Sequence, residues 1–468
     1  MRYILVLVLF VCMACSTDSK REYSYIGGRI VNPNTNFVTL EHNNQVIDTI
    51  LLDRNQNFAY KFNQDKETVY TFTHHPESQT IYLKPGDSTV LRVNTIEFDE
   101  SLSFGGDSSK ENNFLINMFL LNEQDNDLIL SYYRLSPNEF MTKTDSLREL
   151  RLKKFENLNT EKAFSPYFQN IARSTINYEH YDMKERYAFL IKKYIPERFD
   201  DLPDSYFEYR ASVDFNDEDL ISNFSYMRFL DNYLRNKSIE LCEEENRDCY
   251  DLNNHQNLKK RLNLVHELFS LDYLKANFFN RLIRREIVFS KTKSQLEETV
   301  SIIDKFEIPV VDEQELHHLT EIQSHYLIGS NIKNHKFRSI TSDTVLFEDI
   351  SPNKPAVIYT WSSLSMELKR KYLKKINALK IKYPQYNFIG VNLDFQNKRL
   401  WSTGLKQLNY DYETEFQLIS DTPPHRFNFY RNYLDKVYIV DSSSTIVENS
   451  LSLNDPRLES VLSSSVTK

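Results

Sequence analysis

Short apolar runs separated by polar turns fill the first region of the chain, residues 23–104. Each run is rich in β-branched or aromatic residues, and the clusters between the runs contain turn formers, as in Lys84-Pro85-Gly86-Asp87-Ser88. The runs cover residues 25–31, 37–40, 46–50, 68–73, 81–83 and 89–93. Because this spacing has no helical period, it predicts a small antiparallel β-sandwich.

The spacing of apolar residues becomes helical between residues 110 and 328. From Leu258 to Leu282 apolar residues recur at i+3 and i+4, which predicts one long amphipathic helix. Similar spacing covers residues 139–160, 183–195, 217–240, 293–307 and 312–328. Ser136 and Asp312 stand where helices are expected to begin. We expect a central α-helical domain, rich in Tyr and Phe.

Strand and helix patterns alternate in the last region, residues 335–468. Strands are expected at 344–350, 356–361, 388–393, 436–440 and 445–447, and helices at 366–383 and 396–408. This alternation builds an α/β layer around a mostly parallel sheet. The whole chain is therefore predicted to be a multi-domain α+β protein.

The N-terminus has the pattern of a signal peptide. Arg2 is followed by a ten-residue apolar run, Ile4 to Met13. This run is too short to span a membrane, which needs roughly 20 residues. Ala14 before Cys15 resembles a bacterial lipobox, although Cys12 and Met13 depart from its usual residues. We expect residues 1–15 to be a lipoprotein signal peptide and lipobox. They would leave a lipid anchor on Cys15 and place the protein in the bacterial cell envelope, at the outer membrane. A cleaved secretory peptide without lipid is the alternative.

Composition excludes two classes of ligand. Lys and Arg total 57 against 66 Asp and Glu, a net charge of −9, so no nucleic-acid partner is expected. The eight glycines form no G-x-G-x-x-G or G-x-x-x-x-G-K pattern. Phosphate-binding loops need such glycines for close backbone approach, so no nucleotide is expected. No other cofactor is expected either.

Cys242 and Cys249 are the cysteines that remain beyond the N-terminal segment. In an oxidising compartment two neighbouring thiols usually form a disulfide, so we interpret them as a structural staple in an acidic loop. A redox pair is the alternative. A zinc site would need further ligands that the neighbouring sequence does not supply, and no metal is expected.

The C-terminal region resembles periplasmic thioredoxin-like proteins of the TlpA/ResA type. The likeness rests on the order of Pro355–Ser363, a helix, Asn387–Asp394, a second helix and Val437–Asp441. The N-terminal part is similar to lipoproteins of the Bacteroidota in which a small β domain and a helical region precede such a domain. Tyr82–Ser88, followed by Phe104–Gly106 and Glu111–Asn113, carries that second likeness.

The chain departs from this family at the residues that do its chemistry. Family members carry W-x-x-W-C-x-x-C after the first buried strand. Here that segment begins at Trp361 and places Ser365 and Leu368 at the two cysteine positions. A serine or leucine cannot exchange disulfides, because the reaction needs a thiolate and a resolving thiol. The family's cis-proline aligns with Asp435, so this loop is expected to be trans. We therefore predict no catalytic residue.

Other chemistry at these positions has weak support. Ser365 lacks a nearby histidine in sequence, and it suits the N-cap of the following helix. His317 and Glu321 share a helix face but lack zinc spacing, and Asp394 is an acidic strand end.

Three functional hypotheses follow. The first is a redox-inactive binding or scaffold lipoprotein in which Leu364, Ser365, Leu368 and Asp435 line the old active face against an envelope protein. The second is an atypical thiol-disulfide oxidoreductase whose dithiol is Cys242 and Cys249. The third is a carbohydrate or peptide binder that uses the β domain and the aromatic helices.

Overall fold

The chain forms two compact units, residues 1–233 and 234–468, in a computed structural model. The structure describes residues 23–43, 45–241, 255–305, 313–362, 366–394, 401–402, 405–406, 412–419 and 433–464. The boundary between the units falls inside one helix of the predicted central domain, so the helices of that region are divided between the two units. The boundaries predicted at 104–110 and 328–335 stay predictions. Among the described residues, no helix is both long and apolar enough to cross a membrane.

The first unit begins with two sheets that share one core. The strands are β1 (Ser24–Val31), β2 (Phe37–His42), β3 (Gln45–Leu51), β4 (Asn57–Phe62), β5 (Thr68–His74), β6 (Glu77–Leu83), β7 (Ser88–Asn94) and β8 (Ser103–Gly106). Within the described residues they form two four-stranded sheets, in the orders β4-β1-β7-β8 and β3-β2-β5-β6. Apolar residues from both sheets, such as Ile26, Leu40 and Phe72, pack in one fully buried cluster.

The prediction of a purely antiparallel β domain is wrong at one strand pair. β1 and β7 run parallel, from Tyr25 opposite Ser88 to Val31 opposite Asn94. Between them the chain passes through the other sheet, and such a long crossover lets the later strand return in the same direction.

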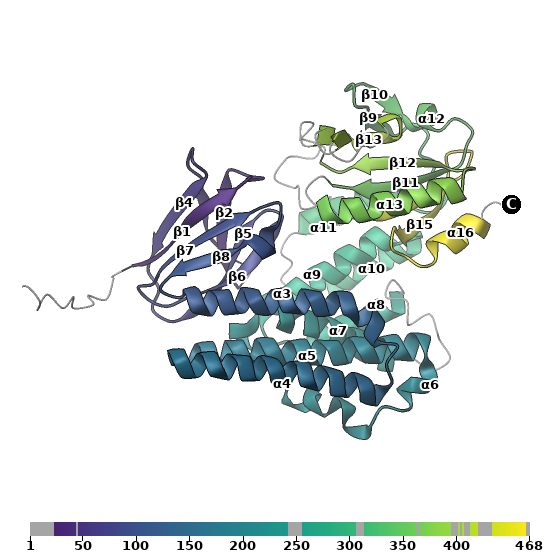
Figure 1. Ribbon diagram of the computed structural model, residues 1–468. Coiled ribbons are helices and arrows are strands. Elements are labelled where there is room, and N and C mark those ends of the chain that lie inside the picture. The colour runs from purple at the N-terminus through teal and green to yellow at the C-terminus, as the bar shows by residue number, and fades with distance from the viewer. Residues whose placement is uncertain are drawn as a thin grey trace, which may run out of the picture. The chain divides into compact units, whose positions relative to one another are not determined.

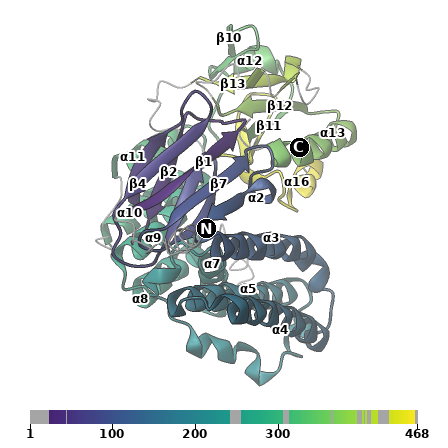
Figure 2. The same ribbon diagram turned by 60° about the vertical axis from the view of Figure 1, so that its left-hand side comes forward.

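Helices complete the first unit. They are α2 (Phe98–Ser101), α3 (Ser109–Tyr132), α4 (Pro137–Lys162), α5 (Pro166–Tyr194), α6 (Pro196–Phe199), the 3₁₀ turns η2 (Asp204–Ser212) and η3 (Glu218–Leu220), and α7 (Phe224–Glu240), which crosses the unit boundary. The predicted helix start at Ser136 is confirmed by a capping box with Glu139. α3 contacts β6 and β8, and α4 and α5 lie side by side (Figures 1 and 2).

The second unit contains α8 (His255–Leu268), α9 (Asp272–Phe289), α10 (Lys293–Lys305) and α11 (Glu313–Ser324). The predicted single helix from Leu258 to Leu282 is wrong, because the chain turns between α8 and α9. This turn brings Phe269 against Phe278, with ring centroids 4.9 Å apart, and both rings are buried. The two apolar faces therefore bury each other, which one straight helix does not allow.

The last part of the second unit is an α/β layer. Its strands are β9 (Lys336–Arg338), β10 (Thr344–Leu346), β11 (Ala356–Trp361), β12 (Asn387–Asn392), β13 (Glu415–Leu418), β14 (Lys436–Val440) and β15 (Ile446–Ser452). Its helical elements are α12 (Phe347–Ile350), α13 (Met366–Lys382), the 3₁₀ turn η5 (Tyr412–Thr414) and α16 (Leu458–Ser464). In the described residues the strand order is β10-β9-β13-β12-β11-β14-β15. The strand predicted at 344–350 ends at Leu346, where α12 begins.

The centre of this sheet agrees with the predicted thioredoxin-like arrangement. β11 pairs parallel with β12 and antiparallel with β14, which in turn pairs antiparallel with β15. α13 connects β11 to β12, and Figure 1 shows it across the sheet. Residues of α13 and α16 share one core with alternate residues of β11, namely Val357, Tyr359 and Trp361. Ala356 and Ile358 face the opposite side, where they join a second core.

Candidate functional site

Trp361 ends β11, and its side chain is buried. Its indole Nε1 donates a hydrogen bond of 2.7 Å to Oε2 of Glu415, and the Tyr359 hydroxyl donates one of 2.5 Å to Oε1. Glu415 is fully buried at the start of β13. A Cβ on Gly390 of β12 would lie 2.1 Å from Oε2 of this carboxylate. Glycine there leaves the space that the carboxylate fills.

Asp394 follows β12 and ties three strand ends together. Its carboxylate accepts hydrogen bonds from the Ser362 hydroxyl (2.6 Å) and the Asn392 amide (2.9 Å). The Gln417 amide donates to the Asp394 carbonyl at 2.8 Å. Both oxygens of this buried carboxylate accept hydrogen bonds from neighbouring side chains. Asp394 therefore holds the C-terminal ends of these strands together.

The backbone of Asp435 has a conformation that a proline cannot adopt. Its φ is +65°, in the left-handed region, whereas the proline ring fixes φ near −65°. Its N–H donates to the Thr360 carbonyl at 3.2 Å, and the Leu453 N–H lies 3.2 Å from its Oδ1. Burial raises the pKa of the Asp435 carboxyl, and a hydrogen bond from Tyr372 of α13 acts against that shift. The peptide before Asp435 is trans; in the described residues the cis peptide is His75–Pro76.

The Lys436 side chain is buried on the face of the sheet that also carries Ala356 and Ile358. Its side chain is 1% exposed, and its ammonium donates to the Val288 carbonyl at the C-terminal end of α9. The rings of Phe289, Tyr433 and Tyr438 surround it, with centroids 5.0, 5.5 and 5.0 Å away. Burial lowers the pKa of Lys436 well below its usual value. The helix end and the aromatic faces offset part of that cost.

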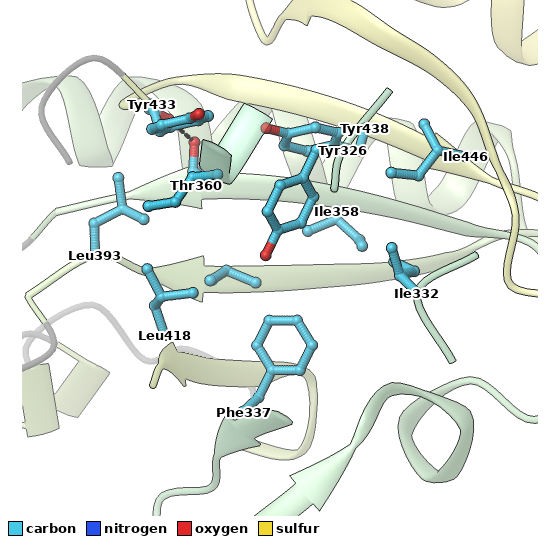
Figure 3. Close-up of a pocket in the computed structure, with 12 residues that line it drawn as sticks. Tyr326, Ile332, Phe337, Ile358, Thr360, Leu393, Leu418, Tyr433, Tyr438 and Ile446 are labelled. Carbon is cyan, nitrogen blue, oxygen red and sulfur yellow. Dashed lines mark hydrogen bonds between the residues drawn. The ribbon is translucent and has the colours of Figure 1, made fainter. Parts of the chain in front are cut away.

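A small apolar cavity of about 60 Å³ lies next to this lysine, over β11, β12 and β14. Figure 3 shows Tyr326 and Tyr438 beside each other in its lining, with ring centroids 5.6 Å apart. Burial raises the pKa of Tyr438 well above its usual value. The other lining residues are Ile322, Ile332, Phe337, Ile358, Thr360, Val391, Leu393, Leu418, Tyr433 and Ile446. The lining is almost entirely hydrocarbon, so the cavity suits an apolar group and offers no catalytic set.

The predicted site residues fall partly outside the described part of the chain. Cys15, Cys242, Cys249, Leu364 and Ser365 lie outside it. Leu368 belongs to α13, and Trp361 and Asp435 are placed as described above. No group of His, Cys, Asp or Glu among the described residues could hold a metal ion.

Sequence analysis missed Glu415, Lys436 and the cavity. Lys436 begins a strand that is otherwise apolar, Lys436-Val437-Tyr438-Ile439-Val440, and a lysine at a position with the period of a buried face is a pattern that could have identified it. Glu415 stands in no comparable pattern. Its burial depends on a gap above Gly390 in the neighbouring strand, which one strand's sequence does not encode.

Two solved structures from Bacteroides are similar to a part of the chain. The thioredoxin domain of a thiol-disulfide oxidoreductase from Bacteroides vulgatus is 19% identical and covers 30% of this chain and 97% of its own length, with a TM-score of 0.23. A thiol:disulfide interchange protein from Bacteroides sp. is 20% identical and covers 30% of this chain and 91% of its own length, with a TM-score of 0.23. No family model and no curated protein matches the sequence. The strand order around β11 is the feature of this chain that corresponds to a thioredoxin-like fold.

Proposed function

We propose that the protein is a lipid-anchored component of the bacterial cell envelope, at the outer membrane, whose C-terminal α/β domain binds a protein partner without exchanging disulfides. Cys15 would carry the anchor. The old active face, formed by Leu364, Ser365, Leu368 and Asp435, would be the binding surface. The observation that carries the proposal is the backbone of Asp435 at φ +65°.

The reason lies in what thiol exchange requires at this loop. In the family that the sequence resembles, a cis-proline presents backbone to a substrate held by the dithiol. At Asp435 the chain takes a conformation closed to proline, and its N–H is already bonded to Thr360. Ser365 and Leu368, which align with the two cysteine positions of that family, contain no sulfur. Both halves of the exchange machinery have therefore changed, which supports a role in binding.

The redox half of the proposal is tested by reduction of insulin with dithiothreitol as electron source. We expect the wild-type protein to add nothing to the uncatalysed rate. The variant Ser365→Cys/Leu368→Cys restores both thiols, yet the altered loop at Asp435 should keep its turnover low. Wild-type activity that disappears in Cys242→Ser/Cys249→Ser would refute the proposal and favour the alternative, an atypical thiol-disulfide oxidoreductase.

The binding half is tested by crosslinking in intact membranes followed by purification of the protein. Leu364→Arg places a charge on the proposed surface. Ile381→Arg is the matched control, because Ile381 lies in α13 and is 83% exposed. We expect Leu364→Arg alone to remove the crosslinked partner. An identical set of partners in both variants would exclude the old active face as the binding surface.

The anchor is tested separately by fractionation of cells that produce Cys15→Ser. We expect the wild-type protein in the outer-membrane fraction and the variant in the soluble envelope fraction, because a lipoprotein cysteine without its sulfur carries no acyl chain. A wild-type protein recovered entirely in soluble form would contradict the anchor and leave a secretory peptide.

A further inference from the structure

The sheet β4-β1-β7-β8 has one face in the core of the β domain and one face toward solvent. Ile26 and Ile30 of β1 belong to the buried cluster, so Tyr25, Gly27 and Arg29, which alternate with them, point outward. The pairing of these four strands contains no register shift, so the outward residues stand in rows across the sheet. We call this side the outer face. Its residues are Tyr25, Gly27, Arg29 and Val31 of β1, Asn57, Ala59 and Lys61 of β4, Ser88, Val90, Arg92 and Asn94 of β7, and Ser103 and Gly105 of β8.

The outer face carries three exposed cations, and none of its residues is acidic. Arg29 stands directly opposite Arg92 of the neighbouring strand β7. Neither of these arginines, nor Lys61 of β4, has a hydrogen bond or an ion pair with any described residue. Like charges on directly opposed residues are destabilising, and a carboxylate between them would offset that cost. The sheet keeps this uncompensated pair in a chain whose net charge is −9.

The side chain of Tyr25 lies along the sheet beside these arginines. A Cβ on Gly27 would lie 2.3 Å from the Tyr25 hydroxyl oxygen, so the phenol extends two residues along β1 and covers Gly27. The hydroxyl therefore reaches the row next to Arg29 and Arg92, and it has no hydrogen-bond partner among the residues that the structure describes. The outer face thus combines a half-buried aromatic ring with two neighbouring guanidinium groups.

We propose that the outer face binds an acidic polysaccharide, with a carboxylate held by Arg29 and Arg92 and a sugar ring packed against Tyr25. A guanidinium group binds a carboxylate through paired N–H donors, and the bound carboxylate removes the repulsion between the two arginines. The C–H groups of a sugar ring suit the negative face of an aromatic ring. Ser103 stands opposite Arg92 and offers a hydroxyl to the hydroxyl groups of the sugar. This site is separate from the old active face.

The arrangement of the cations favours a polymer of acidic sugars over other polyanions. Lys61 stands opposite Tyr25, four residues before Arg29 along β1, so it lies about 13 Å along the sheet from the arginines. At that distance it can meet a carboxylate on another sugar of the same chain. A peptide strand pairs with the edge of a sheet, because the backbone groups inside the sheet are already bonded. Nucleic acid requires a broader basic surface than three cations in an acidic chain provide.

Biolayer interferometry of the purified full chain in mild detergent tests the proposal. The immobilised probes are polygalacturonate and hyaluronate, with neutral dextran and poly-L-glutamate for comparison. We expect at least one acidic polysaccharide to bind, dextran not to bind, and poly-L-glutamate to bind about tenfold more weakly or less. Arg29→Gln and Arg92→Gln should each raise the dissociation constant for the polysaccharide about tenfold. Lys154→Gln is the matched control, because Lys154 is an exposed cation on α4 and its loss should change nothing.

Two further measurements separate this role from a structural one and from simple charge attraction. Without a ligand, Arg29→Gln and Arg92→Gln should not lower the urea midpoint of unfolding, because each removes a repulsion. Tyr25→Ala should weaken polysaccharide binding about fivefold and leave the binding of poly-L-glutamate unchanged. A chain that binds neither polygalacturonate nor hyaluronate overturns the proposal. Equal affinity for poly-L-glutamate, or equal weakening by Lys154→Gln and Arg92→Gln, overturns it as well.

Discussion

Glu179 gives a sharp prediction about pH, because it is a carboxyl group with no exposed surface in α5. Its Oε2 contacts Arg228 and lies 3.3 Å from the Ser225 hydroxyl, whereas its Oε1 has no hydrogen-bond partner among the described residues. Burial raises the pKa of Glu179 from 4.5 to about 7, Arg228 acts against the shift, and Asp182 adds to it. The perturbation is Glu179→Gln, which keeps the shape and removes the titration.

The direction in which the free energy of unfolding changes with pH depends on which state, folded or unfolded, binds the proton more tightly. The folded pKa is above the unfolded one, so the folded state binds the proton more tightly. The stability contribution of Glu179 is therefore full below pH 4.5 and is lost as the pH rises to about 7. The whole shift corresponds to about 3 kcal/mol. From about pH 5 to about pH 8 the wild-type protein should lose about 2–3 kcal/mol relative to Glu179→Gln.

Urea unfolding at several pH values measures this difference. Both tryptophans, Trp361 and Trp401, lie in the second unit, so their fluorescence reports that unit, and far-UV circular dichroism reports both. We expect Glu179→Gln to gain roughly 1 M in the urea midpoint of the first unit, relative to wild type, across this pH range. The fluorescence transition should not change between the two proteins. A difference between wild type and variant that is flat with pH would refute the reasoning.

Further predictions concern single residues. Burial lowers the pKa of His180 to about 4, so the wild-type protein should gain stability relative to His180→Gln as pH rises from 4 to 6.5, the opposite slope to Glu179 in the same urea titration. Gly390→Ala should cost about 1–3 kcal/mol by displacing the Glu415 carboxylate, and a cost that persists undiminished in a Glu415→Ala background would contradict this cause. Asp435→Pro should cost about 3 kcal/mol or more, whereas Asp435→Gly should be tolerated, as measured by tryptophan fluorescence; equal stability of these two variants would argue against the left-handed conformation.

Local sequence patterns predicted single helices and strands better than they predicted which elements pack together. The strand predicted at 356–361 is confirmed as β11 with the same bounds. A short apolar run bounded by Pro355 and polar residues suits a strand that is buried on both faces. The start of α4 at Pro137 follows from the cap at Ser136. The i+3 and i+4 steps on either side of the turn hid the break between α8 and α9. Phe269 and Phe278 are nine residues apart, or about two and a half turns, so they would lie on opposite faces of one straight helix, and this change of phase is the signal that was missed.

The candidate site was predictable in its chemistry but not in its geometry. The absence of sulfur at Ser365 and Leu368 is a property of the sequence, and it alone excludes disulfide exchange at those positions. The left-handed backbone of Asp435, the carboxylate of Glu415 above Gly390 and the ammonium of Lys436 at the end of α9 each depend on two segments meeting.

The sequence by itself determined the type and order of most elements and the missing thiols, since these depend on residue types and their spacing along one strand or helix. The tertiary structure decided which strands pair, where the unit boundary falls and which charges are buried. These outcomes depend on residues far apart in the chain, such as Lys436 and Val288, and their free energy arises only when distant segments exclude water together.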